Sequence, residues 1–514
     1  MPNVAVAVRG VSVTGATVFP ERRIDPLLAG LVGSKIPLAA IEKARIGILD
    51  LYRRGGYPFV TVSAQLDQAG NLRFTVVEAY IAAVKLQGDI GPAGTQVLRF
   101  LNHLTEIGPL SSAALERWLL LAQDVPGVSL RAVLQPSTQD PGALTLVAEV
   151  SRKPFSALMT ADNAAFPQTG PAEGLLVLDA NSFTEFGEKT EVSLYHTSGN
   201  TQNYGQAAFE TFVGGSGLRI RLYYGDGVSN PSGDLRAIGY QGLTTEIGGA
   251  VFYPLIRARV QTLNLHANID SIESEVRDDS GPEGQRVQAS LDQTVAFRMG
   301  FDYALQDLWL GASRPAIDTA SVTLSFGLPF LGTGNYNLDP GRIGEQTGYT
   351  KIAGELTRTQ TLFAPWQGAT VAVKGLLTGQ WSPNVLPPVE KFYLGGLVFN
   401  RGFYSGEVTG DSAVAATAEL QLNTALSFTL FGHPINTAAQ FFGFYDYGYA
   451  WQNQPLDPNA RLASAGGGVR LSLTRYGEFD LYGLTRFTRT PIGAAANVTP
   501  LKTDAVYWRV LFRY

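Results

Sequence analysis

The C-terminal part of this chain, about 360 residues from Pro154 onward, is a succession of short segments in which apolar and polar side chains alternate. Successive side chains of a β-strand point to opposite faces, so each segment predicts a strand with one apolar and one polar face. The last segment, 506–514, carries Arg509 and Arg513 on its polar face. Its apolar face is formed by Val506, Trp508, Val510, Phe512 and Tyr514.

A soluble β-sandwich would show the same alternation in any single strand, so the repetition decides the fold class. Similar segments at 218–224, 322–326 and 419–423 belong to a series without helical periodicity. A series of this length is unusual for one soluble core and fits an antiparallel transmembrane barrel, with lipid outside and water inside. No window approaches 18 consecutive apolar residues, which excludes a transmembrane helix.

Composition narrows the function classes. The 514 residues include no cysteine, which excludes disulfides and thiolate metal sites. A net charge of -5 and a pI of about 5.6 argue against nucleic acid as a partner. The four histidines are scattered, and neither a Ser/His/Asp arrangement nor a paired-carboxylate site can be nominated. We therefore expect no metal, no cofactor and no enzymatic activity.

Residues 1–153 differ from the rest because they contain helical periodicity, and they contain it twice. The first unit is predicted to hold a strand at 6–13, helices at 24–31 and 38–54, and a hairpin of 60–66 with 72–77. The second unit repeats this order with a strand at 81–86, helices at 96–104 and 110–123, the latter capped by Ser111 or Ser112, and a hairpin of 129–135 with 144–150. Each unit is therefore β-α-α-β-β.

Two such units ahead of a barrel resemble POTRA domains, the periplasmic modules of outer-membrane barrels that handle proteins. Residues 51–59, LYRRGGYPF, are similar to the Y-x-x-x-G-Y signature at the end of the longer POTRA helix, and 126–128 resembles the P-G-V that opens the second hairpin. The resemblance implies α+β periplasmic domains at 1–80 and 81–153, followed by an all-β barrel at 154–514.

Motifs in the barrel are similar, in order and spacing, to those of two-partner secretion transporters of the ShlB/FhaC/HecB type, within the BamA-like superfamily. Residues 380–382 match Q-x-S, 390–396 match E-x-F-x-L-G-G, and 444–448 match F-x-D-x-G. Asn400, Arg401, Gly402 and Phe403 stand where the family has V-R-G-Y or V-R-G-F, with Asn in place of Val. The resemblance implies 16 strands and a loop around 383–411 that folds into the lumen.

The chain length agrees with that strand number. Sixteen strands leave about 22 residues for each strand and connection, and roughly 10 suffice to span a membrane. Counting alternating segments also gives about 16, with 306–320 ambiguous. The start, MPNVAVAVRG, lacks the features of a signal peptide, so we expect a mature or trimmed form, or a true start further upstream. The plug helix of some relatives is expected to be missing as well.

Arg401 is the leading candidate for a functional residue. Unpaired charge in a confined site is costly, and arginine can bind a carboxylate through two hydrogen bonds. By alternation, Phe444, Asp446 and Gly448 face the lumen from a predicted strand at 438–449, and Gly448 leaves room for the loop. We expect Arg401 and Asp446 to pair. Two ordinary solvated charges are the alternative.

Other candidates lie on nearby strands. Glu419 resembles the family's lumen glutamate, with an ordinary lumen charge as the alternative. The closing strand, with Trp508, Val510, Phe512 and Tyr514, resembles the signal that the barrel-assembly machinery recognises. The acidic run from Glu273 to Glu283 fits no EF-hand spacing, so we expect a solvated extracellular loop rather than a calcium site.

The resemblance implies an outer-membrane pore of a Gram-negative bacterium. Its POTRA domains would bind a large, unfolded, β-rich exoprotein by strand augmentation and pass it into the lumen. Because no nucleotide-binding motif is present, folding of the exported chain outside would drive transport. The alternative is an insertase that folds other barrels, although such insertases usually carry more POTRA copies. A passive porin would not need the periplasmic part.

Overall fold

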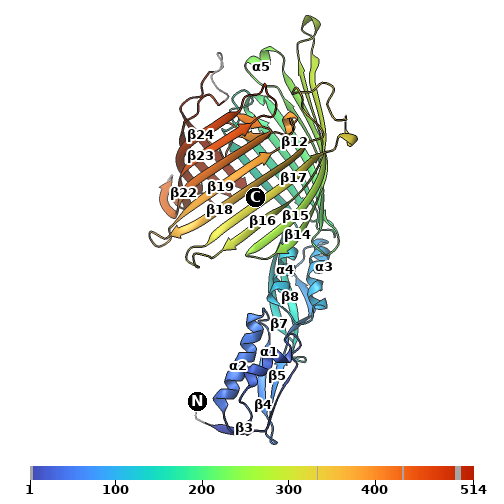
Figure 1. The fold of residues 1–514 in the computed structure, drawn as a ribbon, viewed down its shortest axis with the longest axis vertical. Coiled ribbons are helices and arrows are strands. Elements are labelled where there is room, and N and C mark those ends of the chain that lie inside the picture. Colours follow the sequence, from blue (N-terminus) through green and yellow to red (C-terminus); the bar gives the residue numbers. More distant parts are fainter. Residues whose placement is uncertain (1–3, 333, 431–432, 492–498) are drawn as a thin grey trace.

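The computed structural model describes residues 4–332, 334–430, 433–491 and 499–514. Two small α+β domains follow one another and lead into a large barrel, with the first domain farthest from it (Figure 1). The predicted fold class, periplasmic-type α+β units followed by an all-β barrel, is confirmed. None of the helices in the described ranges is long and apolar enough to cross a membrane.

The core of the first domain lies between a sheet and its longer helix, α2. Ile41, Ala44, Ile48 and Tyr52 recur at intervals of three and four along α2 and are buried. The sheet has the order β2-β5-β4, and β1 pairs with β3. The elements are β1 (Ala5–Val8), β2 (Gly10–Thr14), α1 (Glu21–Leu28), β3 (Gly33–Pro37), α2 (Leu38–Arg54), β4 (Thr61–Leu66) and β5 (Asn71–Val77).

The first domain differs from its prediction in three places. The strand expected at 6–13 is divided at Arg9, because β1 pairs with β3 whereas β2 pairs with β5. Strand β3 was missed since its sequence, GSKIP, contains Gly and Pro and buries only Ile36. The helix expected at 24–31 is α1, which begins directly after Pro20.

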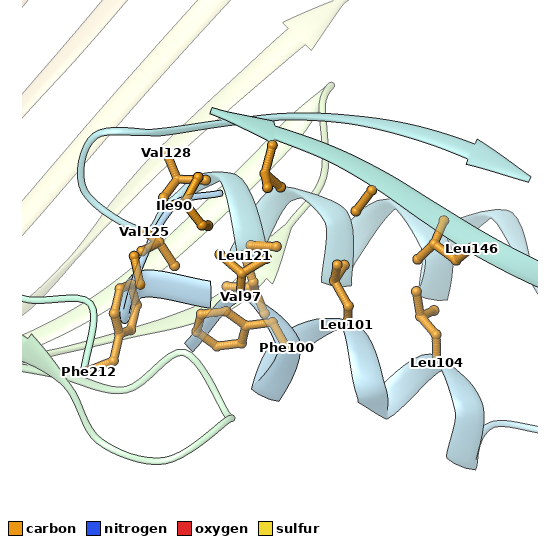
Figure 2. Close-up of a cluster of buried hydrophobic side chains, with 14 of the residues drawn as sticks. Ile90, Val97, Phe100, Leu101, Leu104, Leu121, Val125, Val128, Leu146 and Phe212 are labelled. Atoms are coloured by element: carbon orange, nitrogen blue, oxygen red, sulfur yellow. The ribbon is translucent and has the colours of Figure 1, made fainter. Parts of the chain in front are cut away.

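The second domain has the predicted β-α-α-β-β order. It comprises β6 (Tyr80–Gln87), α3 (Ala93–Glu106), α4 (Ser112–Gln123), β7 (Val128–Pro136) and β8 (Ala143–Arg152). Of the two serines considered as the α4 cap, Ser111 has this role, because its hydroxyl accepts a hydrogen bond from the Ala114 N–H at 3.2 Å. Apolar side chains of α3 and α4 fill the space above the sheet β6-β8-β7 (Figure 2).

Sixteen antiparallel strands form a closed barrel, as predicted, and β26 closes it by pairing with β9. The strands are β9 (Phe155–Asp162), β10 (Glu173–Asn181), β11 (Lys189–Thr197), β12 (Gln202–Phe212), β13 (Arg219–Ser229), β14 (Gln241–Arg257), β15 (Gln261–Asp278), β16 (Val287–Asp307), β17 (Ala316–Gly327), β18 (Thr350–Phe363), β19 (Thr370–Trp381), β22 (Ser412–Leu430), β23 (His433–Trp451), β24 (Ala460–Ser472), β25 (Gly477–Arg486) and β26 (Asp504–Arg513). A short helix, α5 (Asp234–Ala237), lies between β13 and β14.

Alternation along the strands separates two environments. Leu222, Leu356 and Leu420 are more than half exposed on the outer face, whereas charged side chains on the inner face, such as Glu419 and Asp446, are buried. This distribution is that of a barrel with lipid outside, and the inner charges must find partners within the lumen.

The acidic run differs from its prediction. β14, β15 and β16 contain 17, 18 and 21 residues, although about 10 suffice to span a membrane. They extend past the rest of the barrel at the end away from the α+β domains (Figure 1). Glu273, Glu275 and Asp278 therefore lie on β15, whereas Asp279 and Glu283 lie in the connection to β16 as expected. Arg277 donates a hydrogen bond to Glu275 at 2.6 Å.

Candidate functional site

The connection between β19 and β22, residues 382–411, folds back into the barrel, and we call it the lumen loop. Its strands β20 (Phe392–Leu394) and β21 (Val408–Gly410) pair as a hairpin. Small side chains on the barrel wall allow the loop to approach closely. The apolar contact is made by Leu394, Phe403 and Val408 of the loop with Ala413, Ala415, Ala450, Ala460 and Leu462.

Arg401 lies at the tip of the lumen loop and is 3% exposed. Its backbone N–H and its Nε donate to Oδ2 of Asp446 at 2.8 and 3.0 Å, and Nη2 donates to Oδ1 at 2.9 Å. Its Nη1 donates to Glu419. The guanidinium lies 3.7 Å from the centre of the Phe444 ring, within range of a cation–π contact. The structure thus brings Arg401, Asp446, Glu419 and Phe444 together.

A second cation completes this site. Arg470 on β24 donates to both carboxylate oxygens of Glu419, at 2.7 and 3.1 Å, and lies 3.8 Å from the centre of the Phe442 ring. Two cations thus face two carboxylates, so the buried charges balance. Alternation assigns Arg470 to the lumen face, but it is one of many such residues and no motif marks it.

Asn400 and Gly448 fit each other at the loop tip. Asn400 has a φ of 51°, a left-handed conformation that asparagine tolerates and a β-branched residue does not. Its side chain lies over Gly448, where a Cβ would stand 2.4 Å from Oδ1 and 2.8 Å from Nδ2. The absence of a side chain at 448 therefore lets the tip of the loop pack against the wall, and the positive φ favours asparagine over a β-branched residue at 400.

The next residues extend the contact around the wall. A Cβ on Gly402 would stand 2.5 Å from the Cβ of Ser464 on β24, and Phe403 is fully buried. Arg486 on β25 donates to the Gly402 carbonyl and, through Nη2, to the Tyr507 hydroxyl on β26 at 2.8 Å. The tip of the loop therefore contacts an arc of five adjacent strands, β22 to β26. Arg486 was not predicted, because its strand, β25, contains none of the motifs that pointed to the other site residues.

The outward-facing residues of the closing strand lie apart from this site, although Tyr507 on the same strand contacts it. Trp508, Val510 and Phe512 are on β26, and the last two are more than one-third exposed on the outer face. Tyr514 follows β26 and continues its pairing, since its N–H donates to Ala157 at 2.8 Å and its carbonyl accepts from Ala157 at 3.0 Å. Among the residues that the structure describes, no group of three or more His, Cys, Asp or Glu could hold a metal.

The second α+β domain is attached to the end of the barrel. Arg257, at the end of β14, donates to both oxygens of Asp124 at 2.8 and 2.7 Å. Arg117 on α4 donates to the carbonyls of Pro254 and Leu255 at 3.0 and 3.1 Å. Phe212 of the barrel enters the domain core (Figure 2), which places the domain at the lumen entrance.

A closed 16-stranded barrel, two α+β domains at one end and a lumen loop held by a buried arginine define a class: outer-membrane barrels that transport proteins. The family model of the haemolysin secretion/activation proteins ShlB/FhaC/HecB matches residues 144–471, and that of the ShlB-type POTRA domain matches 6–79. The chain belongs to this family. It is a two-partner secretion transporter of the outer membrane, with periplasmic POTRA domains and a cognate secreted exoprotein.

Individual relatives are distant. The heme/hemopexin transporter protein HuxB of Haemophilus influenzae is 20% identical over 462 residues, which cover 87% of this chain and 77% of HuxB. The structure of CdiB from Escherichia coli is 18% identical, with a TM-score of 0.74 over 99% of this chain and 91% of that one. BamA from Haemophilus ducreyi lacking POTRA domains 1–3 is 13% identical, with a TM-score of 0.52 over 99% and 100%. These structures share the fold.

Proposed function

We propose that this transporter exports one large, β-rich exoprotein, which the POTRA domains bind in unfolded form and pass into the lumen. The observation that carries the proposal is the attachment of the second POTRA domain to the barrel through Asp124, Arg257 and Phe212. In the sheet β6-β8-β7, both β6 and β7 are edge strands, because each pairs with β8 on one side only. An extended substrate can add to such an edge by main-chain hydrogen bonds, next to the pore.

The lumen loop has the role of a gate in this proposal. Arg401, Asp446 and Glu419 hold its tip against the wall. For the exoprotein to pass, either the loop must move or the exoprotein must fit into the part of the lumen that the loop leaves open. Folding of the exported protein outside supplies the driving force. We expect neither a cofactor nor enzymatic activity. We also expect insertion of the barrel into the lipid of the outer membrane by the assembly machinery.

Deletion of residues 81–153 tests substrate capture. The exoprotein encoded beside this transporter should be absent from the medium, while the barrel remains in the outer membrane as a heat-modifiable band. The abundance of other outer-membrane barrels should not change, whereas an insertase would lower it. Normal secretion by the deletion variant would contradict the role of the second POTRA domain.

A further inference from the structure

A second buried charge cluster lies at the beginning of the lumen loop, away from Arg401. Glu390 is 1% exposed and faces cations from two strands. Arg298 on β16 donates to its Oε1 at 2.7 Å and to its Oε2 at 3.0 Å. The Nζ of Lys351 on β18 lies 2.7 Å from Oε2. The motif E-x-F-x-L-G-G, which the Arg401 site leaves unexplained, begins at this glutamate.

The cluster also fixes the main chain of the loop. The Glu390 carbonyl accepts hydrogen bonds from Lys351 at 2.9 Å and from Gln380 at 3.1 Å. Arg298 is held in turn by Asp270 on β15, at 2.9 Å to each oxygen. Two cations and two carboxylates balance, as a buried cluster requires. Next to it, Leu386 of the loop is buried together with Ala296 and Tyr349.

The two clusters lie on different arcs of the wall. The Glu390 cluster uses β15, β16 and β18, whereas the Arg401 site uses β22, β23 and β24. The arcs do not overlap, and in the closed barrel β19 lies between them. The lumen loop is therefore attached to the wall at two places, near its beginning through Glu390 and at its tip through Arg401.

We propose that the Glu390 cluster is a second anchor of the lumen loop, independent of Arg401, and that it sets the resting width of the pore. Glu390 is a positioning residue: it determines which part of the lumen the loop occupies. When either anchor is lost, the other still holds the loop, so the pore widens partially. When both are lost, only the remaining contacts hold the loop, among them those of Arg486 with the Gly402 carbonyl and of Arg342 with Asp411, so the pore widens further.

Glu390→Gln tests this anchor, because it keeps the size of the side chain and removes its charge. In planar bilayers we expect a several-fold higher single-channel conductance. The matched control is Glu355→Gln on β18, since Glu355 forms no ion pair with any residue that the structure describes. Its conductance should equal that of the unmodified protein. Glu390→Asp, which retains the charge, should lie between the two.

A labelling experiment reports the position of the loop directly. Ser290 on β16 is buried and lines the cavity between the wall and Pro388 and Val389 of the loop. Because the protein has no cysteine, Ser290→Cys provides a single reactive site. Its reaction with a bulky maleimide should be several-fold faster with Glu390→Gln than with Glu355→Gln. Heat-modifiability on gels verifies that each barrel is folded, and Lys351→Gln repeats the test if Glu390→Gln does not fold.

The combination with Arg401→Ala tests independence. Conductance should rise further in the Glu390→Gln, Arg401→Ala double variant than in either single variant. Unchanged conductance and unchanged labelling in Glu390→Gln would overturn the proposal, as would a double variant identical to Arg401→Ala. Neither measurement requires the exoprotein. The test of the second anchor can therefore succeed or fail independently of the test of the proposed secretion.

Discussion

The backbone N–H and the guanidinium of Arg401 bind the same carboxylate, that of Asp446. One wall residue therefore fixes both the main chain of the loop tip and its charge. Glu419 binds the remaining side of the guanidinium and is itself held by Arg470. A displacement of the loop must break the contacts of Arg401 with Asp446 and Glu419 together, which makes the pair a suitable site for mutation.

Arg401→Ala and Asp446→Ala should each strongly reduce secretion, and the double variant should be little worse than either. Removal of one member of a buried ion pair leaves the other charge without its partner, which costs about 3 kcal/mol or less in a lumen wetter than a core. A double-mutant cycle on secretion and on barrel stability measures the coupling. Strictly additive losses would show that the two residues act separately.

Gly448→Ala should displace the loop tip and lower secretion, although it adds only a methyl group. The new Cβ would stand 2.4 Å from the Asn400 side chain, closer than any van der Waals contact. Gly443→Ala is the matched control, because on the same strand its nearest atom is the Gly466 carbonyl oxygen at 3.9 Å. Asn400→Gly, compatible with the positive φ, should restore secretion to Gly448→Ala. Equal effects of both alanines would contradict the steric explanation.

Alternation was sufficient to assign Asp446 and Glu419 to the lumen face, and the periodicity of residues 38–54 predicted α2 in full. The partners of the loop could not be predicted in the same way. Arg298 and Glu390 are 92 positions apart, and Arg401 and Asp446 are 45 apart. Which lumen residue meets the loop depends on the tilt and shear of the closed barrel, and no local pattern encodes these. The motif resemblance supplied Asp446, whereas Arg470 and Arg486 had no such signal.

Tyr52 of the LYRRGGYPF motif should stabilise the first POTRA domain through Glu78. Its hydroxyl donates to Glu78 Oε1 at 2.5 Å, and the same oxygen accepts from the N–H groups of Thr17 and Val18 at 2.8 and 3.0 Å. Tyr52→Phe should cost about 1 kcal/mol. Tyr57→Phe is the control, since the Tyr57 hydroxyl has no hydrogen-bond partner among the described residues. Urea unfolding, reported by a fluorophore on Ala69→Cys in the full-length protein, measures both.

The same contact predicts an acid dependence. Burial alone would raise the pKa of Glu78, but hydrogen bonds from Thr17, Tyr52 and Val18 outweigh burial and lower it. A lowered pKa in the folded state means that the stabilisation is present above the unfolded value of about 4.3 and is lost as the pH falls below it. Glu78→Gln should remove this acid step from the urea midpoint of the first domain. A step that persists in the variant would assign it to another group.

Removal of Phe512, Arg513 and Tyr514 should sharply lower the amount of barrel in the outer membrane. The structure offers two reasons. The outer-face aromatics Phe512 and Tyr514 are the proposed assembly signal, and the deleted backbone also closes the barrel. Phe512 and Arg513 are in register with Met159 and Leu158, and Tyr514 exchanges two hydrogen bonds with Ala157.

The variant Phe512→Ala, Tyr514→Ala separates these reasons, because it retains every backbone hydrogen bond between β26 and β9. If the aromatic side chains are the signal, this variant should reach the membrane as poorly as the deletion does. If instead the backbone pairing of β26 with β9 determines the amount of barrel in the membrane, this variant should accumulate normally. It should then lose only thermal stability, since both side chains are exposed to lipid. We expect the first outcome. Quantification of the heat-modifiable band in outer-membrane fractions, with Leu511→Ala on the lumen side of the strand as the control, decides between them.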